Sequence, residues 1–224
     1  MTQLPNTETQ STRASREQHW QQFTTRVSAA FDAAPESESA MTGLLSPVLH
    51  RLYNCIAGAP DFRQQLSLCP DTNSNESSNW SRVLFADEHI KVGLQAVYLG
   101  NPIPLHDHPG SAGVVLVLSG AVNFQYANVI GSWTNPGPIE LRIARIRNRL
   151  PGQVCWFHAE DRNIHRVEAN TDRAIILVAH LRQGDGGSRH MYFPVSDYEP
   201  AEGIRFLAHR MKIQRRQSES SELN

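Results

Sequence analysis

The chain has few cysteines, and they form no pattern. Three occur in 224 residues, at positions 55, 69 and 155, and no two of them form a Cys-x-x-Cys pair. An odd number without paired spacing does not predict a disulfide framework or a cysteine-based zinc site. We therefore expect a cytoplasmic, reducing environment and a core that is stabilised by apolar packing.

Long apolar runs and an excess of charge of either sign are also missing. No run reaches the roughly 20 apolar residues that cross a bilayer, and the N-terminus lacks the basic-then-apolar pattern of a secretion signal. The formal net charge is −1, which offers no general attraction to nucleic acid or anionic lipid. We expect a monomer or homodimer that acts on a small molecule, without nucleic-acid or membrane partners.

The composition divides the chain into four segments. Polar residues dominate both ends, and a disordered tail is predicted at 1–14 and a polar, solvated tail at 210–224. Apolar residues recur at helical spacing in 15–69, which predicts helices packed on the rest of the protein. From 80 to 209 the apolar residues alternate with polar ones, as is typical of strands with one buried face.

Several runs with period-two alternation lie in the β-rich segment. Turn signals such as Asn-Pro-Gly at 135–137 and Pro-Gly at 151–152 separate them. Short strands at this spacing predict a mainly β fold, an all-β barrel or jelly roll whose mouth can hold one small ligand. The alternating runs are 90–98, 122–126 and 139–143, and two further apolar runs follow at 154–157 and 174–179.

The most informative motif is His106-Asp107-His108. Side chains two positions apart on a strand point to the same face, so that two imidazoles can converge on one metal ion. Apolar β-branched residues follow at once at Val114 and Val115, which favours a strand. Asp107 points to the opposite face and either orients a ligand or serves the structure alone.

The frame of this motif resembles the first motif of the cupin superfamily. Gly100, His106, His108 and Gly120 match its glycines and histidines, while the glutamate of the family is absent. The stretch 163–170 resembles the second cupin motif, with its asparagine one position late and without the usual Pro-x-Gly before it. The resemblance covers roughly residues 80–195 and implies a double-stranded β-helix barrel preceded here by α-helices.

The second motif supplies a third histidine, His165. A cupin with three histidines and no glutamate resembles the thiol dioxygenases, which include cysteine dioxygenase, 3-mercaptopropionate dioxygenase and the cysteamine and plant cysteine oxidases. The resemblance implies that His106, His108 and His165 bind Fe(II). It also implies that O2 oxidises a small thiol, cysteine-like or 3-mercaptopropionate-like, to its sulfinate. His158 is an alternative ligand.

Three further residues are candidates for the substrate pocket. Arg82 stands near the position where cysteine dioxygenases carry an arginine for the substrate carboxylate; otherwise it is a surface residue. Tyr192 resembles a tyrosine of the cysteamine and plant oxidases that donates a hydrogen bond near the iron; otherwise its ring packs in the barrel wall. His180 acts as a proton donor or carboxylate partner, or is a satisfied residue at the rim.

Two alternative readings remain open at this point. The cysteine that cross-links to a tyrosine in animal cysteine dioxygenase corresponds to Gly113, and the Pro-Pro-Tyr segment of the plant group is missing. These departures favour a non-catalytic metal-binding cupin that senses a small ligand. A cupin enzyme of other chemistry on Zn, Ni, Mn or Cu is the second alternative, because three histidines also suit those metals and a fold does not determine a function.

Overall fold

The computed structural model describes residues 10–33, 38–57, 64, 66–70, 79–131, 137–158, 163–182 and 187–213. Two helices, α1 (Gln10–Asp32) and α2 (Glu38–Ala57), precede the strands. The strands are β1 (Trp80–Ala86), β2 (Ile90–Tyr98), β3 (Ile103–His106), β4 (Ser111–Ser119), β5 (Val122–Ile130), β6 (Ile139–Arg149), β7 (Val154–Phe157), β8 (Ile164–Ala169), β9 (Arg173–Arg182), β10 (His190–Pro194) and β11 (Arg205–Lys212). Neither helix is long and apolar enough to cross a membrane.

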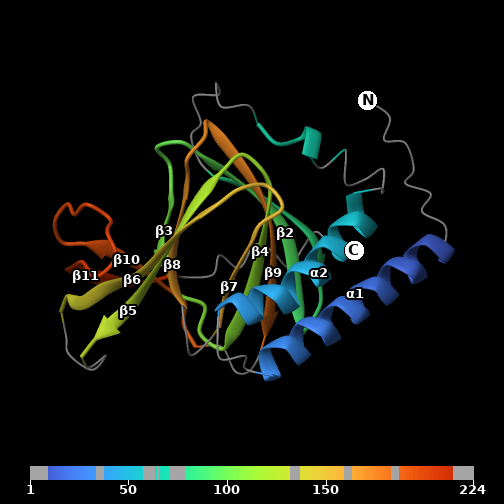
Figure 1. Cartoon of the computed structure of the whole chain (residues 1–224), viewed down its shortest axis with the longest axis horizontal. Helices are drawn as coiled ribbons and strands as arrows, with labels where there is room; N and C mark the ends of the chain where they lie inside the picture. Colours follow the sequence, from blue (N-terminus) through green and yellow to red (C-terminus); the bar gives the residue numbers. More distant parts are fainter. Residues whose placement is uncertain are drawn as a thin grey trace.

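The strands form two antiparallel sheets. One has the order β1-β2-β9-β4-β7, and the other closes into a six-stranded barrel in the order β10-β11-β6-β5-β8-β3. The helices lie against the first sheet, on the side away from the closed barrel (Figure 1). This arrangement confirms the predicted mainly β, double-stranded β-helix fold with helices near the N-terminus.

The first sheet is buried on both faces because its strands alternate between two sets of apolar residues. One set packs against the helices and includes Val92, Leu94, Val114, Leu116 and Leu177 from the sheet with Phe23, Val27, Phe31, Leu45 and Leu49 from the helices. Burying each such side chain contributes about 1.5–3 kcal/mol before the entropy of ordering is subtracted. The helices therefore cover one face of the sheet and leave the other face to the barrel.

Two further cores lie on opposite sides of β3, β8 and β5. Between the sheets, Val115, Val117, Phe124, Val167 and Val178 pack together. Inside the closed barrel, the core contains Leu141, Ile143, Ile164, Tyr192 and Phe206. Neighbouring residues of β8, such as Ile164 and His165, therefore face different interiors, and this alternation decides which side chains reach the metal centre.

The described elements extend beyond the predicted boundaries at both ends. Helix α1 begins at Gln10, inside the stretch 1–14 that was predicted as a tail. Strand β11 continues to Lys212, three residues past the predicted end of the barrel at 209, since it pairs with β10 along that length. Residues 1–9 and 214–224 of the predicted tails lie outside the described residues.

Candidate metal centre

The structure brings together three buried histidines that can hold a metal ion. His106 ends β3, His108 follows it by two residues, and His165 lies on β8. One ring nitrogen from each lies within 4.8 Å of the others. His106 and His165 are direct partners across the β3–β8 ladder, which places their side chains on the same face. Among the described residues, no carboxylate belongs to this group.

His108 reaches the group from a turn and not from a strand, which differs from the sequence-based expectation. Strand β3 ends at His106. The Ser111 N–H donates to the His108 carbonyl over 3.0 Å, closing a turn through Pro109 and Gly110. Gly110 adopts a φ of 65°, a conformation that favours glycine. This turn returns the chain into β4 and keeps the His108 imidazole beside that of His106, with ring centroids 4.7 Å apart.

Backbone carbonyls set the tautomers of two of the rings. His106 Nδ1 donates to the Pro104 carbonyl over 2.8 Å, and His165 Nδ1 donates to the Asn163 carbonyl over 3.0 Å. A carbonyl can only accept, so Nδ1 carries the proton in both rings. The Nε2 lone pairs are then available for a metal, which is the usual role of such outer hydrogen bonds. The donor set therefore fits a divalent metal ion.

Asn163 joins two of the candidate ligands. Its side-chain carbonyl accepts the backbone N–H of His108, and its backbone carbonyl holds His165. The turn that carries His108 is thereby attached to the start of β8, although the two lie more than fifty residues apart in the chain. The sequence pointed to Asn163 only as part of the second motif and did not suggest this bridge.

Burial keeps the three imidazoles neutral. Loss of hydration lowers the pKa of His106 to about 4 and the pKa values of His108 and His165 well below their usual range. Repulsion among the rings and from Arg189 lowers them further. A metal binds the neutral imidazole, so these rings are in the binding-competent form at pH 7.

We expect the metal-free protein to lose stability in acid below about pH 6.5. In the unfolded chain these histidines bind protons near pH 6.5, whereas their lowered pKa values keep them neutral in the folded state. The unfolded state therefore gains stability as the pH falls from 6.5 toward about 4, by roughly 1.4 kcal/mol per pH unit for each histidine. Urea denaturation between pH 8 and pH 5 measures this loss; a flat profile would contradict the buried neutral site.

An aromatic ring covers one side of the group. Phe157, at the end of β7, stacks on His108 and His165, with centroids 4.6 Å and 4.5 Å away. Gly113 on β4 makes room for this ring, because a Cβ there would lie 2.0 Å from Phe157 Cζ. Strand β4 therefore contributes no side chain at Gly113, and the Phe157 ring of the neighbouring strand β7 occupies that space beside the histidines.

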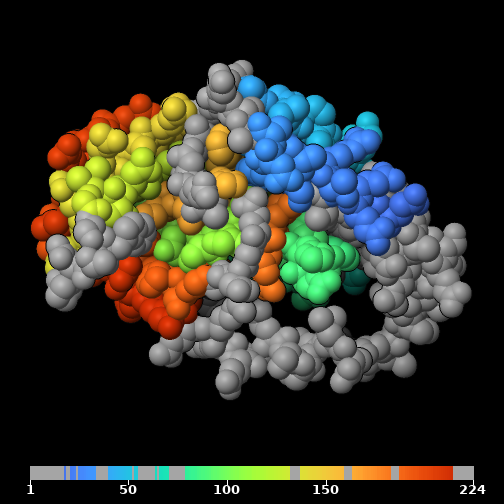
Figure 2. Space-filling model, turned by 90° about the horizontal axis from the view of Figure 1, so that it is seen from below, coloured from blue at the N-terminus to red at the C-terminus, as the bar shows by residue number. Residues whose placement is uncertain are grey.

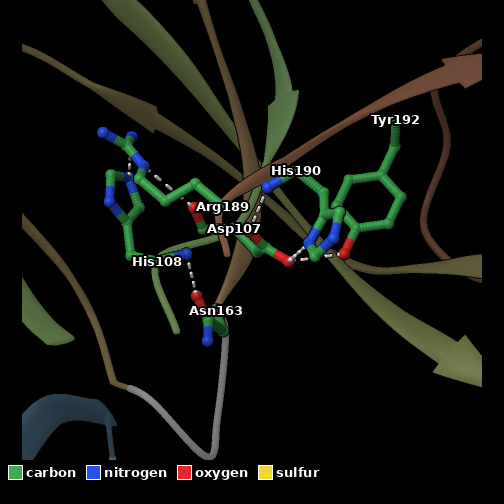
Figure 3. A network of polar contacts seen from close by, with 6 residues as sticks. All are labelled: Asp107, His108, Asn163, Arg189, His190 and Tyr192. Atoms are coloured by element: carbon green, nitrogen blue, oxygen red, sulfur yellow. Dashed lines mark hydrogen bonds and ion pairs between the residues drawn. The ribbon is translucent and has the colours of Figure 1, made fainter. Parts of the chain in front are cut away.

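Arg189 and His180 complete the polar surroundings of the histidines. Arg189 places its Nη2 3.3 Å from Nε2 of His108, and its Nε donates to the Asp107 carbonyl over 3.4 Å (Figure 3). His180 on β9 lies with its ring centroid 4.6 Å from that of His108. Burial, followed by repulsion from Arg189, lowers the pKa of His180 to about 3. His180 thus lies beside His108, and its predicted role as a proton donor or carboxylate partner stays a prediction, while Arg189 was not foreseen.

Asp107 points away from the imidazoles on either side of it. Its buried carboxylate accepts the backbone N–H of His190 over 2.7 Å and the hydroxyl of Tyr192 over 2.6 Å, and it lies 3.2 Å from His190 Nδ1. Figure 3 shows His108 and Tyr192 on opposite sides of Asp107. The Tyr192 hydroxyl, whose pKa is raised by burial and by this hydrogen bond, is therefore engaged by Asp107 and does not face the three histidines.

The structure does not bring Arg82 or His158 to the histidines. Arg82 is exposed on β1 and pairs with Leu94, whose side chain packs in the core beneath the helices. Cross-strand partners share a face, so Arg82 projects from the side of the sheet that is opposite to the metal centre. The His158 ring lies 5.5 Å from that of Phe31 in helix α1.

Comparisons with known proteins show similarity of fold at low sequence identity. No protein-family model matches the chain, and no curated protein matches it. Similar solved structures include a cupin superfamily protein from Desulfitobacterium hafniense, with 15% identity, a TM-score of 0.36 and coverage of 49% of this chain and 82% of that one. A cupin-like protein from Thermotoga maritima has 19% identity, a TM-score of 0.37 and coverage of 50% and 74%. An oxalate oxidase in complex with glycolate has 17% identity, a TM-score of 0.37 and coverage of 54% and 58%.

Proposed function

We propose that this chain is an Fe(II)-dependent dioxygenase that oxidises a small, carboxylate-bearing thiol to its sulfinate. The supporting observation is a group of three buried histidines, without a carboxylate among them, next to one guanidinium group. The three neutral ligands leave the charge of a divalent ion unreduced, which favours binding of an anionic thiolate. Iron is taken from the resemblance to thiol dioxygenases, because three imidazoles alone suit several metals.

The reaction needs no further reductant. A thiol and one O2 molecule combine into a sulfinic acid, so that both oxygen atoms end on the sulfur and no other product forms. When bound, Fe(II) supplies the redox chemistry between the thiol and O2. The protein would hold both reactants in a fixed arrangement, and this positioning can remove much of the entropy cost of a bimolecular encounter from the reaction step.

Arg189 has the position that a carboxylate-binding residue requires. Its guanidinium lies beside His108, and a guanidinium fork can bind a carboxylate with two parallel hydrogen bonds. A carboxylate bound there would hold the rest of a small thiol against the histidines. We therefore assign the substrate carboxylate to Arg189 in place of Arg82. The Phe157 ring, which stacks on His108 and His165, adds an apolar surface to the site.

The first experiment measures O2 consumption by anaerobically iron-loaded protein with four thiols. Cysteine and 3-mercaptopropionate carry a carboxylate, whereas cysteamine does not, and a peptide with N-terminal cysteine tests a larger substrate. We expect consumption with one or both carboxylate thiols and a product that is 32 mass units heavier, for two oxygen atoms. No consumption with any thiol, by protein that demonstrably holds iron, would favour a non-catalytic metal-binding protein.

Substitution of Arg189 tests whether Arg189 or Arg82 binds the substrate carboxylate. We expect Arg189→Gln to raise KM for a carboxylate thiol by about 10- to 150-fold, the equivalent of the 1.5–3 kcal/mol typical of a lost charged hydrogen bond. Cysteamine, which lacks the carboxylate, should show no such increase. The matched control is Arg82→Gln, which removes the same charge from the exposed edge strand. If the control shows the larger effect, the assignment to Arg189 is wrong.

A further inference from the structure

A cleft with two arginines lies on β5 and β6, beside the strand that carries His165. Its volume is about 420 Å³, and it is lined by Tyr126, Asn128, Arg142, Ile143, Ala144, Arg145 and Gly203. A volume of this size is typical of small-molecule sites. None of the three histidines and no atom of Arg189 belongs to its lining, so the cleft is not part of the metal centre.

Four polar side chains of the cleft, those of Tyr126, Asn128, Arg142 and Arg145, share one face of β5 and β6, whereas Ile143 belongs to the core of the closed barrel. Asn128 pairs with Arg142 and Tyr126 pairs with Arg145 across these strands, and paired residues share a face. Tyr126 also pairs with His165 on the other side of β5. The face is therefore the one that carries the metal centre. Figure 2 shows β5 and β6, in yellow-green and yellow, beside the red C-terminal strands and away from the helical end of the molecule.

Positive charge is concentrated on this face. Arg205 on β11 pairs directly with Arg142, which places two like charges opposite each other, an unfavourable arrangement in a sheet. Glu140 lies 3.9 Å from Arg205, and Glu202 is 3.0 Å from Arg147. Neither of these ion pairs includes Arg142. Within the described part of the chain, the exposed Arg142 side chain makes no hydrogen bond or ion pair.

We propose that the cleft is a binding site for a small phosphate-type anion. Two guanidinium groups and an amide on one concave surface supply planar, forked donors that match the geometry of phosphate oxygens. A bound anion would also relieve the repulsion between Arg142 and Arg205. A nucleic acid is a poorer occupant, because the formal net charge of the chain is −1 and the cleft has the volume of a small ligand.

Titration calorimetry of the full chain with pyrophosphate tests this proposal. The protein is first stripped of metal, because pyrophosphate itself binds metal ions. We expect saturable binding of one pyrophosphate per chain, and at least tenfold weaker binding by the Arg142→Gln, Arg145→Gln double variant. Arg142→Gln alone, at an exposed position, should weaken binding at least threefold while leaving the melting temperature unchanged.

Two matched variants distinguish the cleft from general charge and from the metal centre. Arg26→Gln with Arg51→Gln removes the same two charges from exposed positions on the helices and should leave the pyrophosphate affinity within twofold. Arg189→Gln should do the same. An equal loss in the helix variant, a loss in the Arg189 variant, or no binding by the unaltered chain would each overturn the proposal.

Two further ligands identify the source of the anion. Tighter binding of AMP than of pyrophosphate would assign the cleft to phosphate esters, and the reverse order would assign it to the free oxyanion; both results support an anion site. Stronger binding of a single-stranded oligonucleotide than of either small anion would overturn the proposal, because it would show a nucleic-acid surface in place of a small-ligand cleft.

Discussion

A His108→Ala variant should bind a metal ion at least about 100-fold more weakly than the unaltered chain, since even the loss of an outer hydrogen-bond partner can lower metal affinity 10- to 100-fold. The variant removes one of three candidate ligands, and the described residues around the group offer no carboxylate to replace it. Activity with a thiol should fall with the metal. Metal content after dialysis against a competing chelator, measured by mass spectrometry, gives the result directly.

The control for this experiment is an exposed histidine. His89 lies on a surface turn, where its imidazole is 3.3 Å from the carboxylate of Glu88, and His89→Ala should leave the metal content unchanged. A His108→Ala variant that retains one metal ion per chain with unaltered affinity would show that the ion binds elsewhere. In that case both the candidate centre and the proposed dioxygenase activity would be wrong.

The parts of the fold that the sequence could predict are those with local signals. Apolar residues at period two mark β2 and β5, and a continuous apolar run marks β9, because these strands bury one or both faces against a core. The His106 and His108 pair is visible in the sequence because its two members are only two residues apart. Even so, the turn that places His108 was not foreseen, since it depends on the pairing of Asp107 with β10.

The remaining parts of the site depend on contacts between distant segments. Arg189 approaches His108 across 81 residues of sequence, and the position of β10 beside β3 brings it there. Phe157 reaches the histidines only because Gly113 on the neighbouring strand lacks a side chain. A glycine within an apolar strand is a weak signal of such a close approach, and nothing near Arg189 in the sequence distinguishes it from other arginines.

The position of Tyr192 shows how a closed barrel separates neighbouring residues. The sequence suggested that its hydroxyl faces the iron, by resemblance. In the structure β10 belongs to the closed barrel, and Tyr192 lies in the interior of that barrel with Leu141 and Phe206. Period-two alternation predicts that adjacent residues face opposite ways, but it does not state which interior each one enters. Only the strand order resolves this point.

Asp107→Ala is expected to destabilise the folded chain by about 2–5 kcal/mol. The carboxylate accepts hydrogen bonds from the Tyr192 hydroxyl and the His190 N–H, and its removal leaves both donors without this acceptor in a buried region. Each buried donor without a partner costs about 1–3 kcal/mol. Urea denaturation of the metal-free protein at pH 8 measures the effect apart from any change in metal binding.

The matched control is another aspartate that accepts backbone N–H groups, but at the surface. Asp87 accepts the N–H groups of His89 and Ile90 at an exposed turn. Because water can replace this carboxylate, Asp87→Ala should cost no more than about 1 kcal/mol. An Asp107→Ala variant that is no less stable than the Asp87 variant would show that the buried network contributes little.

The pair of Asp107 and Tyr192 allows the network to be divided into its parts. Tyr192→Phe removes one donor and leaves the acceptor with the His190 N–H, so it should cost less than Asp107→Ala. In the double variant the unpaired hydroxyl is absent, and the total cost should be smaller than the sum of the two single costs by about 0.5–3 kcal/mol. Additive costs would mean that the hydrogen bond between Tyr192 and Asp107 does not connect β10 to the segment between His106 and His108. A clear coupling would show that the residue between two candidate ligands stabilises the strand that directly follows Arg189, and so links the fold of the closed barrel to the geometry of the site.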